Sequence, residues 1–334
     1  MKAIVTGANG FIGANVVLAL LRENIEVRAL VRKQSDTRAL TGLDVELVQG
    51  DLRDAASVRA ALRGCDALFH TAALYTLWTR TPAEVYATNV AGTETVMKAA
   101  LAQGIEKIVY TSSESTVACT GDGSAATEES GCTDPNGAPG DYKRSKCLAE
   151  QLVLKLCQAG LPAVIVNPTT PLGPHDYKPT PTGRIVVDFL NGRMPAYVEA
   201  GFNFVDVEDV AAGHLLALKK GTPGQRYLLG NRNMTFQEML ELLGQIAGRK
   251  PPRWRLPLSV ALAAAYTDEL VRGKLLGREP RIPVAGVKAA GKRRFFDCAK
   301  ARRELGLPQT PIPRTLEKAV AWFQTHGYIH QRIR

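Results

Sequence analysis

A glycine-rich turn stands at the first junction between a predicted strand and a predicted helix. The apolar run Lys2–Thr6 predicts a buried strand, and the glycines of the turn follow it at positions 7, 10 and 13. In dinucleotide-binding folds the first such glycine allows a tight bend, the second lets the backbone approach a pyrophosphate, and the third lets the helix pack closely. Free N–H groups at the helix N-terminus then face the phosphates. The position of this turn predicts a dinucleotide-binding fold.

The first half of the chain alternates short apolar strands with longer amphipathic helices. This alternation predicts a parallel sheet with helices on both faces, and right-handed crossovers make it doubly wound. The predicted strands are Lys2–Thr6, Val27–Val31, Val45–Gln49, Ala67–His70, Lys107–Thr111 and Ala163–Asn167. The predicted helices between them are Ile12–Arg22, Ala55–Leu62, Glu84–Ala102 and Tyr142–Ala159. We therefore expect an α/β Rossmann fold.

The pattern changes after Pro168, where a proline-rich stretch up to residue 183 predicts irregular structure. A strand and a helix return at Phe204–Val207 and Val210–Lys219, and the rest of the chain is mostly helical in pattern. We predict that residues 1–170 form an NADP-binding Rossmann domain and that 202–222 return to it. Residues 171–201 and 223–334 are predicted to form a smaller, mostly helical lobe that binds the substrate.

Composition is that of an ordinary globular enzyme, with 45% hydrophobic and 22% charged residues. The six cysteines form no C-x-x-C pair and no zinc-like cluster, so we expect reduced thiols and no metal site. The N-terminus begins as a strand rather than as a signal peptide, and the longest apolar run, Leu256–Tyr266, is too short to span a bilayer. These features predict a cytoplasmic protein, and they leave monomer and homodimer both open.

The end of the second predicted strand selects the cofactor. NAD binders usually place an acidic residue there to hold the ribose 2′-hydroxyl. Val31 stands at this position instead, and Arg32 and Lys33 follow it. A basic pair suits a 2′-phosphate, although a solvated basic turn is the alternative and Asp36 could still replace the missing acid. We therefore predict NADP(H) in preference to NAD(H).

A tyrosine and a lysine, Tyr142 and Lys146, stand four residues apart on a predicted helix and so share one face. A nearby ammonium stabilises a phenolate, which lets a tyrosine exchange a proton with an alcohol or carbonyl. Ser113 follows the fifth predicted strand, at the edge where ligands bind, and could hold the substrate oxygen, with Ser112 as the alternative. Asn89 could support a water relay to the lysine. The predicted catalytic residues are therefore Ser113, Tyr142, Lys146 and Asn89.

Taken together and in order, these motifs resemble the extended short-chain dehydrogenase/reductases. The matching segments are TGANGFIG (6–13), GDL (50–52), HTAA (70–73), NVAGT (89–93), TSS (111–113), YKRSK (142–146) and NP…GP (167–174). Within that family, VRALVR and YTSS resemble the dihydroflavonol reductase group, while NPTTPLGPHDYKPTPTGR and AAGHLLAL resemble bacterial hopanoid-associated sugar epimerases. The resemblance implies that Tyr142 is the acid/base, that Lys146 binds the nicotinamide ribose, and that Ser113 orients the substrate carbonyl.

The motifs and the resemblance together give a predicted site. Cofactor contacts are expected from Thr6, Gly7, Asn9, Gly10, Phe11, Ile12, Gly13, Arg32, Lys33, Asp51, Leu52, Thr71, Ala72, Ala73, Thr111, Tyr142, Lys146, Asn167 and Pro168. Substrate contacts are expected from Tyr75, Trp78, Ser113, Glu114 and Thr170, with loop packing as the alternative for the two aromatic residues. Glu114 stands where the group has a small or apolar residue, so it could repel acidic substrates or face solvent.

These residues predict an NADP(H)-dependent oxidoreductase that reduces a ketone or aldehyde to an alcohol. The substrate would be a small-molecule or lipid-linked carbonyl compound, and the resemblance points to hopanoid or isoprenoid lipid metabolism. One alternative is a sugar or nucleotide-sugar epimerase or dehydratase that retains NAD(P). Many such enzymes carry an arginine in the strand that corresponds to Ala163–Asn167, which has no cation here. The other alternative, a non-catalytic NADP-binding sensor, is disfavoured by the intact Ser–Tyr–Lys set.

A strongly basic segment, residues 249–303, holds 15 Lys and Arg against 4 Asp and Glu. A solvated face, a nucleic-acid site and a peripheral membrane surface are the three interpretations. No nucleic-acid-binding motif is present, so we expect no nucleic-acid partner. Trp254, the run Leu256–Tyr266 and the cluster Lys292–Phe296 place apolar side chains beside the cations. A solvated face is the default interpretation, and the resemblance to hopanoid-associated proteins favours weak contact with an anionic membrane at its cytoplasmic face over a nucleic-acid site.

Overall fold

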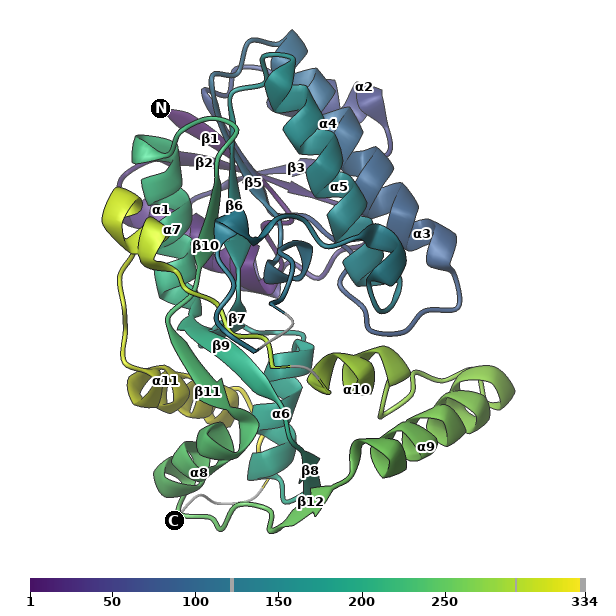
Figure 1. The fold of residues 1–334 in the computed structure, drawn as a ribbon. Coiled ribbons are helices and arrows are strands. Elements are labelled where there is room, and N and C mark those ends of the chain that lie inside the picture. The colour runs from purple at the N-terminus through teal and green to yellow at the C-terminus, as the bar shows by residue number, and fades with distance from the viewer. Residues whose placement is uncertain (121–122, 292, 331–334) are drawn as a thin grey trace.

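Seven parallel strands form the centre of the larger lobe in this computed structural model, which describes residues 1–120, 123–291 and 293–330 (Figure 1). Their order is β10-β6-β5-β4-β1-β2-β3, so the order reverses at β1, where ligands bind in such sheets. The bounds are β1 (Lys2–Thr6), β2 (Glu26–Val31), β3 (Glu46–Gln49), β4 (Ala67–His70), β5 (Lys107–Thr111), β6 (Ala163–Pro168) and β10 (Arg226–Leu229). The predicted doubly wound α/β fold is confirmed, with the first six strands in the expected places.

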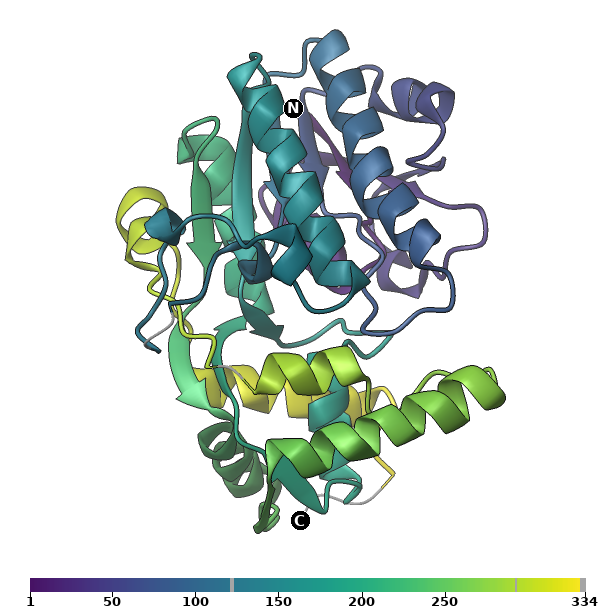
Figure 2. The same cartoon turned by 45° about the vertical axis from the view of Figure 1, so that its right-hand side comes forward.

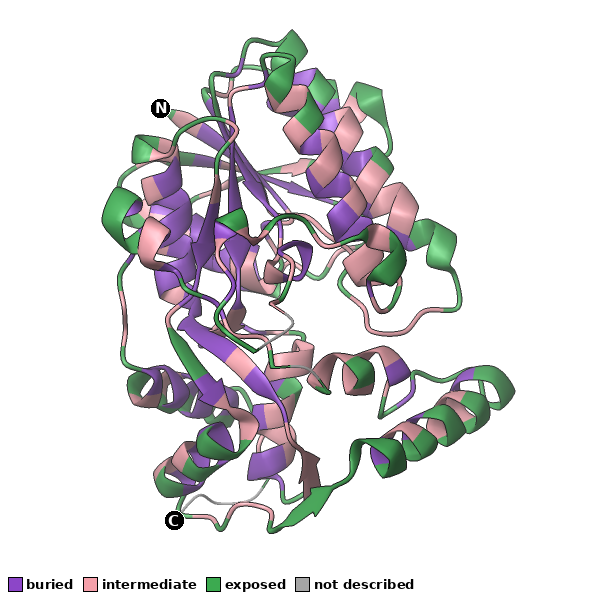
Figure 3. Ribbon diagram, viewed as in Figure 1, coloured by how far each residue is buried: buried purple, intermediate pink, exposed green. Residues whose placement is uncertain are grey.

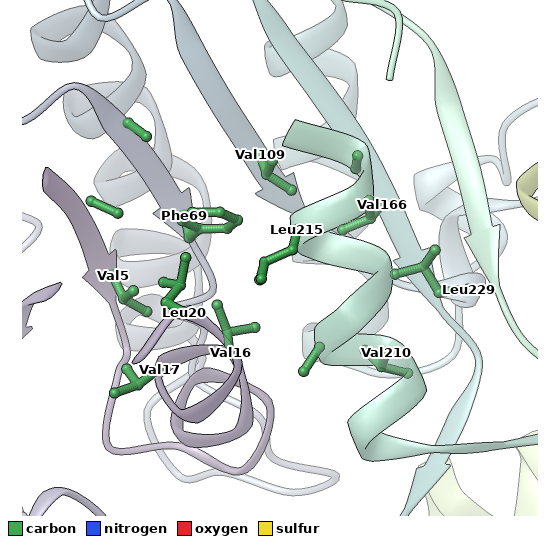
Figure 4. Packing of buried hydrophobic residues seen from close by; sticks show 14 of the residues in the cluster. Val5, Val16, Val17, Leu20, Phe69, Val109, Val166, Val210, Leu215 and Leu229 are labelled. Carbon is green, nitrogen blue, oxygen red and sulfur yellow. The ribbon is translucent and has the colours of Figure 1, made fainter. Parts of the chain in front are cut away.

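Helices cover both faces of this sheet, so its central strands are buried on both sides, whereas the edge strand β3 is largely exposed (Figure 3). One face carries α2 (Ala55–Leu62), α3 (Pro82–Tyr86), α4 (Gly92–Ala102) and α5 (Asp141–Gln158), and a π-helical turn, η2 (Ala87–Ala91), joins α3 to α4. The opposite face carries α1 (Phe11–Arg22) and α7 (Val207–Lys220). Neighbouring strand residues point to opposite faces: Ile4 belongs to the α2/α4/α5 cluster, and Val5 packs with Leu20 and Leu215 on the other side (Figure 4).

The smaller lobe is built from short strands and helices below the sheet in Figure 1. Its elements are β7 (Thr170–Leu172), α6 (Pro181–Leu190), β8 (Ala196–Val198), β9 (Gly201–Asp206), β11 (Arg232–Thr235), α8 (Phe236–Ala247), β12 (Trp254–Leu256), α9 (Leu258–Asp268), η6 (Glu269–Leu275), α10 (Val284–Ala290) and α11 (Ile312–Thr325). Single turns complete the chain at η1 (Arg38–Leu40), η3 (Glu114–Thr116), η4 (Glu128–Ser130), η5 (Pro135–Gly137) and η7 (Ala301–Leu305). None of the helices in the described part of the chain is both long and apolar enough to cross a membrane.

Two segments pair differently from our expectation. β9, expected to return to the Rossmann sheet, pairs instead with β7 and β11 in a separate three-stranded sheet. β10, expected in the substrate lobe, pairs with β6 and becomes the seventh strand of the large sheet. Only α7, which follows β9, packs on that sheet. The local apolar pattern identified β9 but not β10, and it carries no information about a strand's pairing partner.

The proline-rich stretch after Pro168 also contains more regular structure than we expected. Thr170–Leu172 form a strand, and α6 starts at Pro181. Proline is compatible with the first helical position because the N–H that it lacks has no intrahelical partner there. The Thr180 hydroxyl caps this helix by accepting a hydrogen bond from the Gly183 N–H.

Candidate active site

The glycine turn after β1 has the geometry that a pyrophosphate requires. Gly7 has a φ of 68°, and a Cβ atom on it would lie 2.6 Å from the Cα of Ala72. A Cβ on Gly13 would overlap the carbonyl oxygen of Gly7, while the Gly10 N–H closes the turn on that same oxygen at 2.9 Å. Within the described chain no side chain caps α1 and no acid lies in its first turn. The N-terminal N–H groups of α1 are therefore positioned to take phosphate oxygens.

Residues after β4 close the other side of this turn. The Thr71 hydroxyl donates to the Thr6 carbonyl at 2.7 Å, and the Ala72 N–H donates to the Thr6 hydroxyl at 3.3 Å. Buried His70 joins the Thr6 and Thr93 hydroxyls, and burial lowers its pKa to about 3, so the ring is neutral. The other predicted residues of these two loops, Asn9, Phe11, Ile12 and Ala73, are partly exposed at the same edge.

Cations surround the end of β2. Val31 is buried, whereas Arg32 and Lys33 are exposed. The Asp36 carboxylate, which could have replaced the missing acid, accepts hydrogen bonds from Nε and Nη2 of Arg38 at 2.9 and 2.7 Å. Those hydrogen bonds lower the pKa of Asp36. Arg38 was not among the predicted site residues, and its only sequence signal is its position two residues after Asp36.

The turn after β3 holds a second carboxylate–arginine pair. The Asp51 carboxylate accepts hydrogen bonds from Nε and Nη2 of Arg53 at 2.9 and 2.6 Å. These hydrogen bonds are the main reason why the pKa of Asp51 falls to about 2. Leu52 packs close to Gly92 at the start of α4, where an added Cβ would lie 3.0 Å from the leucine side chain. Asp51 and Leu52 therefore lie at the edge of the sheet next to the β2 cations, and Arg53 is a neighbour that the sequence did not indicate.

The first turn of α5 presents Tyr142 beside Ser113. Burial raises the pKa of the Tyr142 phenol, Tyr75 and Glu114 raise it further, and a hydrogen bond with Ser113 lowers it. The Ser113 Oγ accepts hydrogen bonds from the N–H and the hydroxyl of Ser115 at 3.2 and 2.9 Å. Because these contacts use its lone pairs, the Ser113 proton is directed away from them. Its contact with Tyr142 is therefore a donated hydrogen bond, and the two hydroxyls lie together at the carboxyl edge of β5.

Lys146 lies one turn further along α5 and is buried. Its Nζ donates to the Thr111 carbonyl at 2.7 Å and to the Tyr110 hydroxyl at 3.2 Å. Burial lowers its pKa to about 8, against the opposing effect of Glu150. We expected Lys146 to lower the Tyr142 pKa, but in this geometry its ammonium faces Thr111 and Tyr110 instead. The Thr111 side chain points to the other face, where its hydroxyl contacts His214 at 2.8 Å.

Asn89 positions backbone rather than contacting Lys146. Its Oδ1 accepts from the Leu74 N–H at 2.7 Å, and its Nδ2 donates to the Ser145 hydroxyl at 2.9 Å. Ser145 in turn donates to the Tyr142 carbonyl at 2.7 Å. Asn89 lies in the π-helical turn η2, a distortion frequent at functional sites. It therefore links the loop after β4 to the start of α5.

A buried polar network lies beneath Ser113. The Asn167 Nδ2 donates to the Ser113 carbonyl at 3.1 Å and to the Glu150 carboxylate at 2.7 Å. Glu150 also accepts from Thr116 at 2.7 Å and is paired with Arg226 at 3.3 Å. Asn167 and Pro168 are fully buried or nearly so. We predicted cofactor contacts for both, but the Asn167 amide group is turned toward Ser113 and Glu150.

Arg294 reaches this site from the other lobe. Its guanidinium is paired with the Glu114 carboxylate, and the two side chains are only 12% and 16% exposed. Glu114 therefore neither faces solvent nor keeps an uncompensated charge. Part of the basic cluster for which we considered a membrane surface is engaged within the protein, because Arg293 pairs with Glu199 and Phe296 is buried. Lys292 lies outside the described residues.

Comparison with known proteins places these motifs in a family. The profile of the NAD dependent epimerase/dehydratase family matches residues 3–230. The chain belongs to this family. It is 46% identical to a Synechocystis sp. protein named "Putative dihydroflavonol 4-reductase" (97% of this chain, 95% of that protein). It is 38% identical to the "Sterol demethylase protein B" of Methylococcus capsulatus (98% and 100%). A crystal structure titled gox2253 matches with a TM-score of 0.87 at 43% identity (98% and 99%).

The protein is thus an NAD(P)-binding oxidoreductase of the epimerase/dehydratase family.

Tyr75 and Trp78, the two aromatic residues predicted to contact the substrate, lie in different parts of the structure. The Tyr75 ring lies against the Tyr142 ring, with centroids 4.5 Å apart. Trp78 packs on Gly273 of η6, where a Cβ would lie 2.9 Å from its Cζ2 atom. A pocket between the lobes is lined by residues 76–79, 139–141, 269, 284, 285 and 288. Thr170 begins β7 and pairs with Phe204 in the small sheet.

Proposed function

We propose that this enzyme uses NADP(H) to reduce a ketone or aldehyde to an alcohol through Ser113, Tyr142 and Lys146. One observation carries the proposal: the Ser113 and Tyr142 hydroxyls lie together at the edge of the sheet that also holds the glycine turn. Two hydroxyl donors suit a carbonyl oxygen on which negative charge develops. The pKa of Tyr142 is raised, so the phenol keeps its proton at neutral pH, as a general acid requires.

The residues have separate roles in this proposal. The turn from Gly7 to Gly13 and the N-terminus of α1 would hold the pyrophosphate, and the nicotinamide would supply the hydride. Ser113 donates a hydrogen bond to the substrate oxygen and polarises the carbonyl. Tyr142 then gives its phenolic proton to that oxygen as the alcohol forms. Lys146, by the family resemblance, would hold the nicotinamide ribose.

The preference for NADP(H) rests on the end of β2. No acid stands at Val31, and Asp36 is engaged by Arg38. Arg32, Lys33 and Arg38 are all exposed in the segment that follows β2, and Asp36 is the one acid among them. A 2′-phosphate fits that charge, because guanidinium groups bind phosphate oxygens in bidentate fashion.

The substrate that we propose is an apolar carbonyl compound, small or lipid-linked. Tyr75 adds an aromatic face next to Tyr142, and Arg294 neutralises Glu114, so the surroundings of the phenol favour uncharged groups. The relative named for sterol demethylation supports a cyclic isoprenoid substrate, and hopanoid or isoprenoid metabolism stays part of the proposal. An epimerase would change the configuration of its substrate without net use of cofactor, which separates the two functions experimentally.

The test is NADPH oxidation with a series of ketones from cyclohexanone to a 3-oxosteroid. We expect stoichiometric formation of alcohol and NADP⁺, with deuterium from deuterated NADPH recovered at the carbinol carbon. Isomerisation of nucleoside-diphosphate sugars without net cofactor consumption, together with no ketone reduction, would assign the protein to the epimerases instead.

A further inference from the structure

The helix formed by α9 and η6 exposes its large apolar side chains to solvent, which is unusual for a surface helix of a globular protein. Ala261, Ala265 and Gly273 are its buried residues. Its exposed positions include Val260, Tyr266, Leu270 and Leu275. A surface helix ordinarily buries its large apolar residues and exposes polar ones. This helix does the reverse, and it projects from the lobe beside α10 in both views (Figures 1 and 2).

The exposure is concentrated in one segment, which we call the 254–282 surface. Among the described residues, the large apolar side chains that are more than half exposed come from this segment, with the single exception of Leu47. They are Trp254 (75%), Leu275 (73%), Leu276 (58%), Tyr266 (53%), Leu270 (52%) and Val260 (51%). An exposed apolar patch that is larger than usual for a monomer often marks an interaction site. Figure 3 shows the same segment as mostly exposed.

The charges left unpaired on the 254–282 surface are cationic, because each of its acidic side chains has a partner within the protein. Asp268 pairs with Arg272, and its carboxylate also accepts a hydrogen bond from the Ile282 N–H at 2.9 Å. Glu269 accepts from the Val284 N–H at 2.7 Å, and Glu279 pairs with Arg184. Lys274 and Arg278 are exposed, and no carboxylate in the described chain lies within ion-pair distance of them. Exposed apolar and cationic side chains therefore occur together in this segment.

We propose that the 254–282 surface docks on an anionic lipid bilayer. Aliphatic and aromatic side chains enter the interface while the cations meet lipid headgroups, and Trp254 and Tyr266 are residue types that favour that depth. A second copy of the chain fits less well, because a two-fold contact would place the same cationic patch on both sides of the interface. Aliphatic side chains such as Leu275 and Leu276 have no use against a nucleic acid. Docking does not depend on the proposed reaction.

The docked face also adjoins the predicted substrate pocket. Two residues of η6 lie beside this pocket. Gly273 contacts Trp78, and Glu269 lines the pocket together with Gly140. The outer face of the same helix would lie on the lipid. A substrate that resides in the membrane would then be presented next to α5.

Vesicle co-sedimentation of the full chain tests the proposal. We expect binding to mixed phosphatidylcholine–phosphatidylglycerol vesicles at low salt, weaker binding at high salt, and little binding to phosphatidylcholine alone. Leu275→Gln with Leu276→Gln should lower the affinity at least about tenfold. Lys274→Gln with Arg278→Gln should lower it about tenfold and remove most of the salt dependence. Leu47→Gln, at an apolar residue on β3 that is also more than half exposed, is the control and should bind like the wild type.

Two further measurements keep the outcome decisive. Circular dichroism and NADPH binding should be unchanged in every variant, and bromolipid quenching of wild-type fluorescence should be lost in Trp254→Phe. Wild-type protein that stays in the supernatant with anionic vesicles at low salt would overturn the proposal. It would also be overturned if the leucine variant bound as well as the wild type. A concentration-dependent dimer that the same variant abolishes would assign the face to a second copy instead.

Discussion

Arg294 forms its ion pair with Glu114 across 180 positions of sequence, next to the serine proposed to hold the substrate. Because both side chains are largely buried, removing one charge strands the other. We predict that Glu114→Gln lowers the free energy of unfolding by about 3 kcal/mol. The double variant Glu114→Gln with Arg294→Met should recover most of that loss, because no buried charge is then unpaired. Urea denaturation of the two single variants and the double variant measures this coupling. A change below about 0.5 kcal/mol in Glu114→Gln would mean that the pair is effectively solvated.

Cofactor choice gives a second prediction. NADPH should bind at least about tenfold more tightly than NADH, a difference of about 1.4 kcal/mol. Arg32→Ala and Arg38→Ala should each weaken NADPH binding and leave NADH binding nearly unchanged, because only NADPH carries the 2′-phosphate. Arg53→Ala, which removes a cation paired with Asp51 in the neighbouring turn, is the control. Fluorescence titration with both cofactors decides the matter, and equal affinities in the wild type would refute the preference.

The sequence was sufficient to locate six of the seven strands of the large sheet, but it did not show how β9 and β10 pair. Short apolar runs that alternate with helical patterns located β1 to β6, because a strand buried on both faces is apolar at successive positions. Pairing of β10 with β6 joins residues that lie 61 positions apart in the chain, such as Arg226 and Ile165, and no local pattern encodes such a contact. The spacing of Tyr142 and Lys146 identified the helix face. Arg294 could not be found in this way, because its place beside Glu114 is set by the crossing of a distant segment.

The glycine turn can be tested at Gly13. Gly13→Ala places a methyl group onto the Gly7 carbonyl oxygen, so the turn or α1 must shift. We predict a loss of about 1–3 kcal/mol in the free energy of unfolding and at least tenfold weaker NADPH binding. Gly137→Ala, at a position where nothing lies within 4 Å of an added Cβ, is the control. Thermal denaturation and NADPH titration measure both effects, and unchanged NADPH affinity in Gly13→Ala would argue against pyrophosphate binding at this turn.

The pH profile should report on Lys146. Its pKa is lowered to about 8 by burial, so the ammonium is present below that pH and is lost above it. If the proposed reduction needs this charge, kcat/KM for the ketone should be level below pH 8 and fall above it. Lys146→Arg, which stays charged, should move the decline to higher pH even if its maximal rate is lower. An identical alkaline decline in that variant would show that another group causes it.

Proton donation by Tyr142 is the central claim, and Tyr142→Phe tests it most directly. The measurement is NADPH oxidation with a ketone that the wild type accepts, alongside NADPH binding measured by fluorescence. We predict that Tyr142→Phe binds NADPH like the wild type but turns over roughly 10²–10⁴-fold more slowly. Tyr75→Phe, which removes the hydroxyl of the neighbouring ring, should keep most of its activity. Turnover by Tyr142→Phe at the wild-type rate would contradict the account.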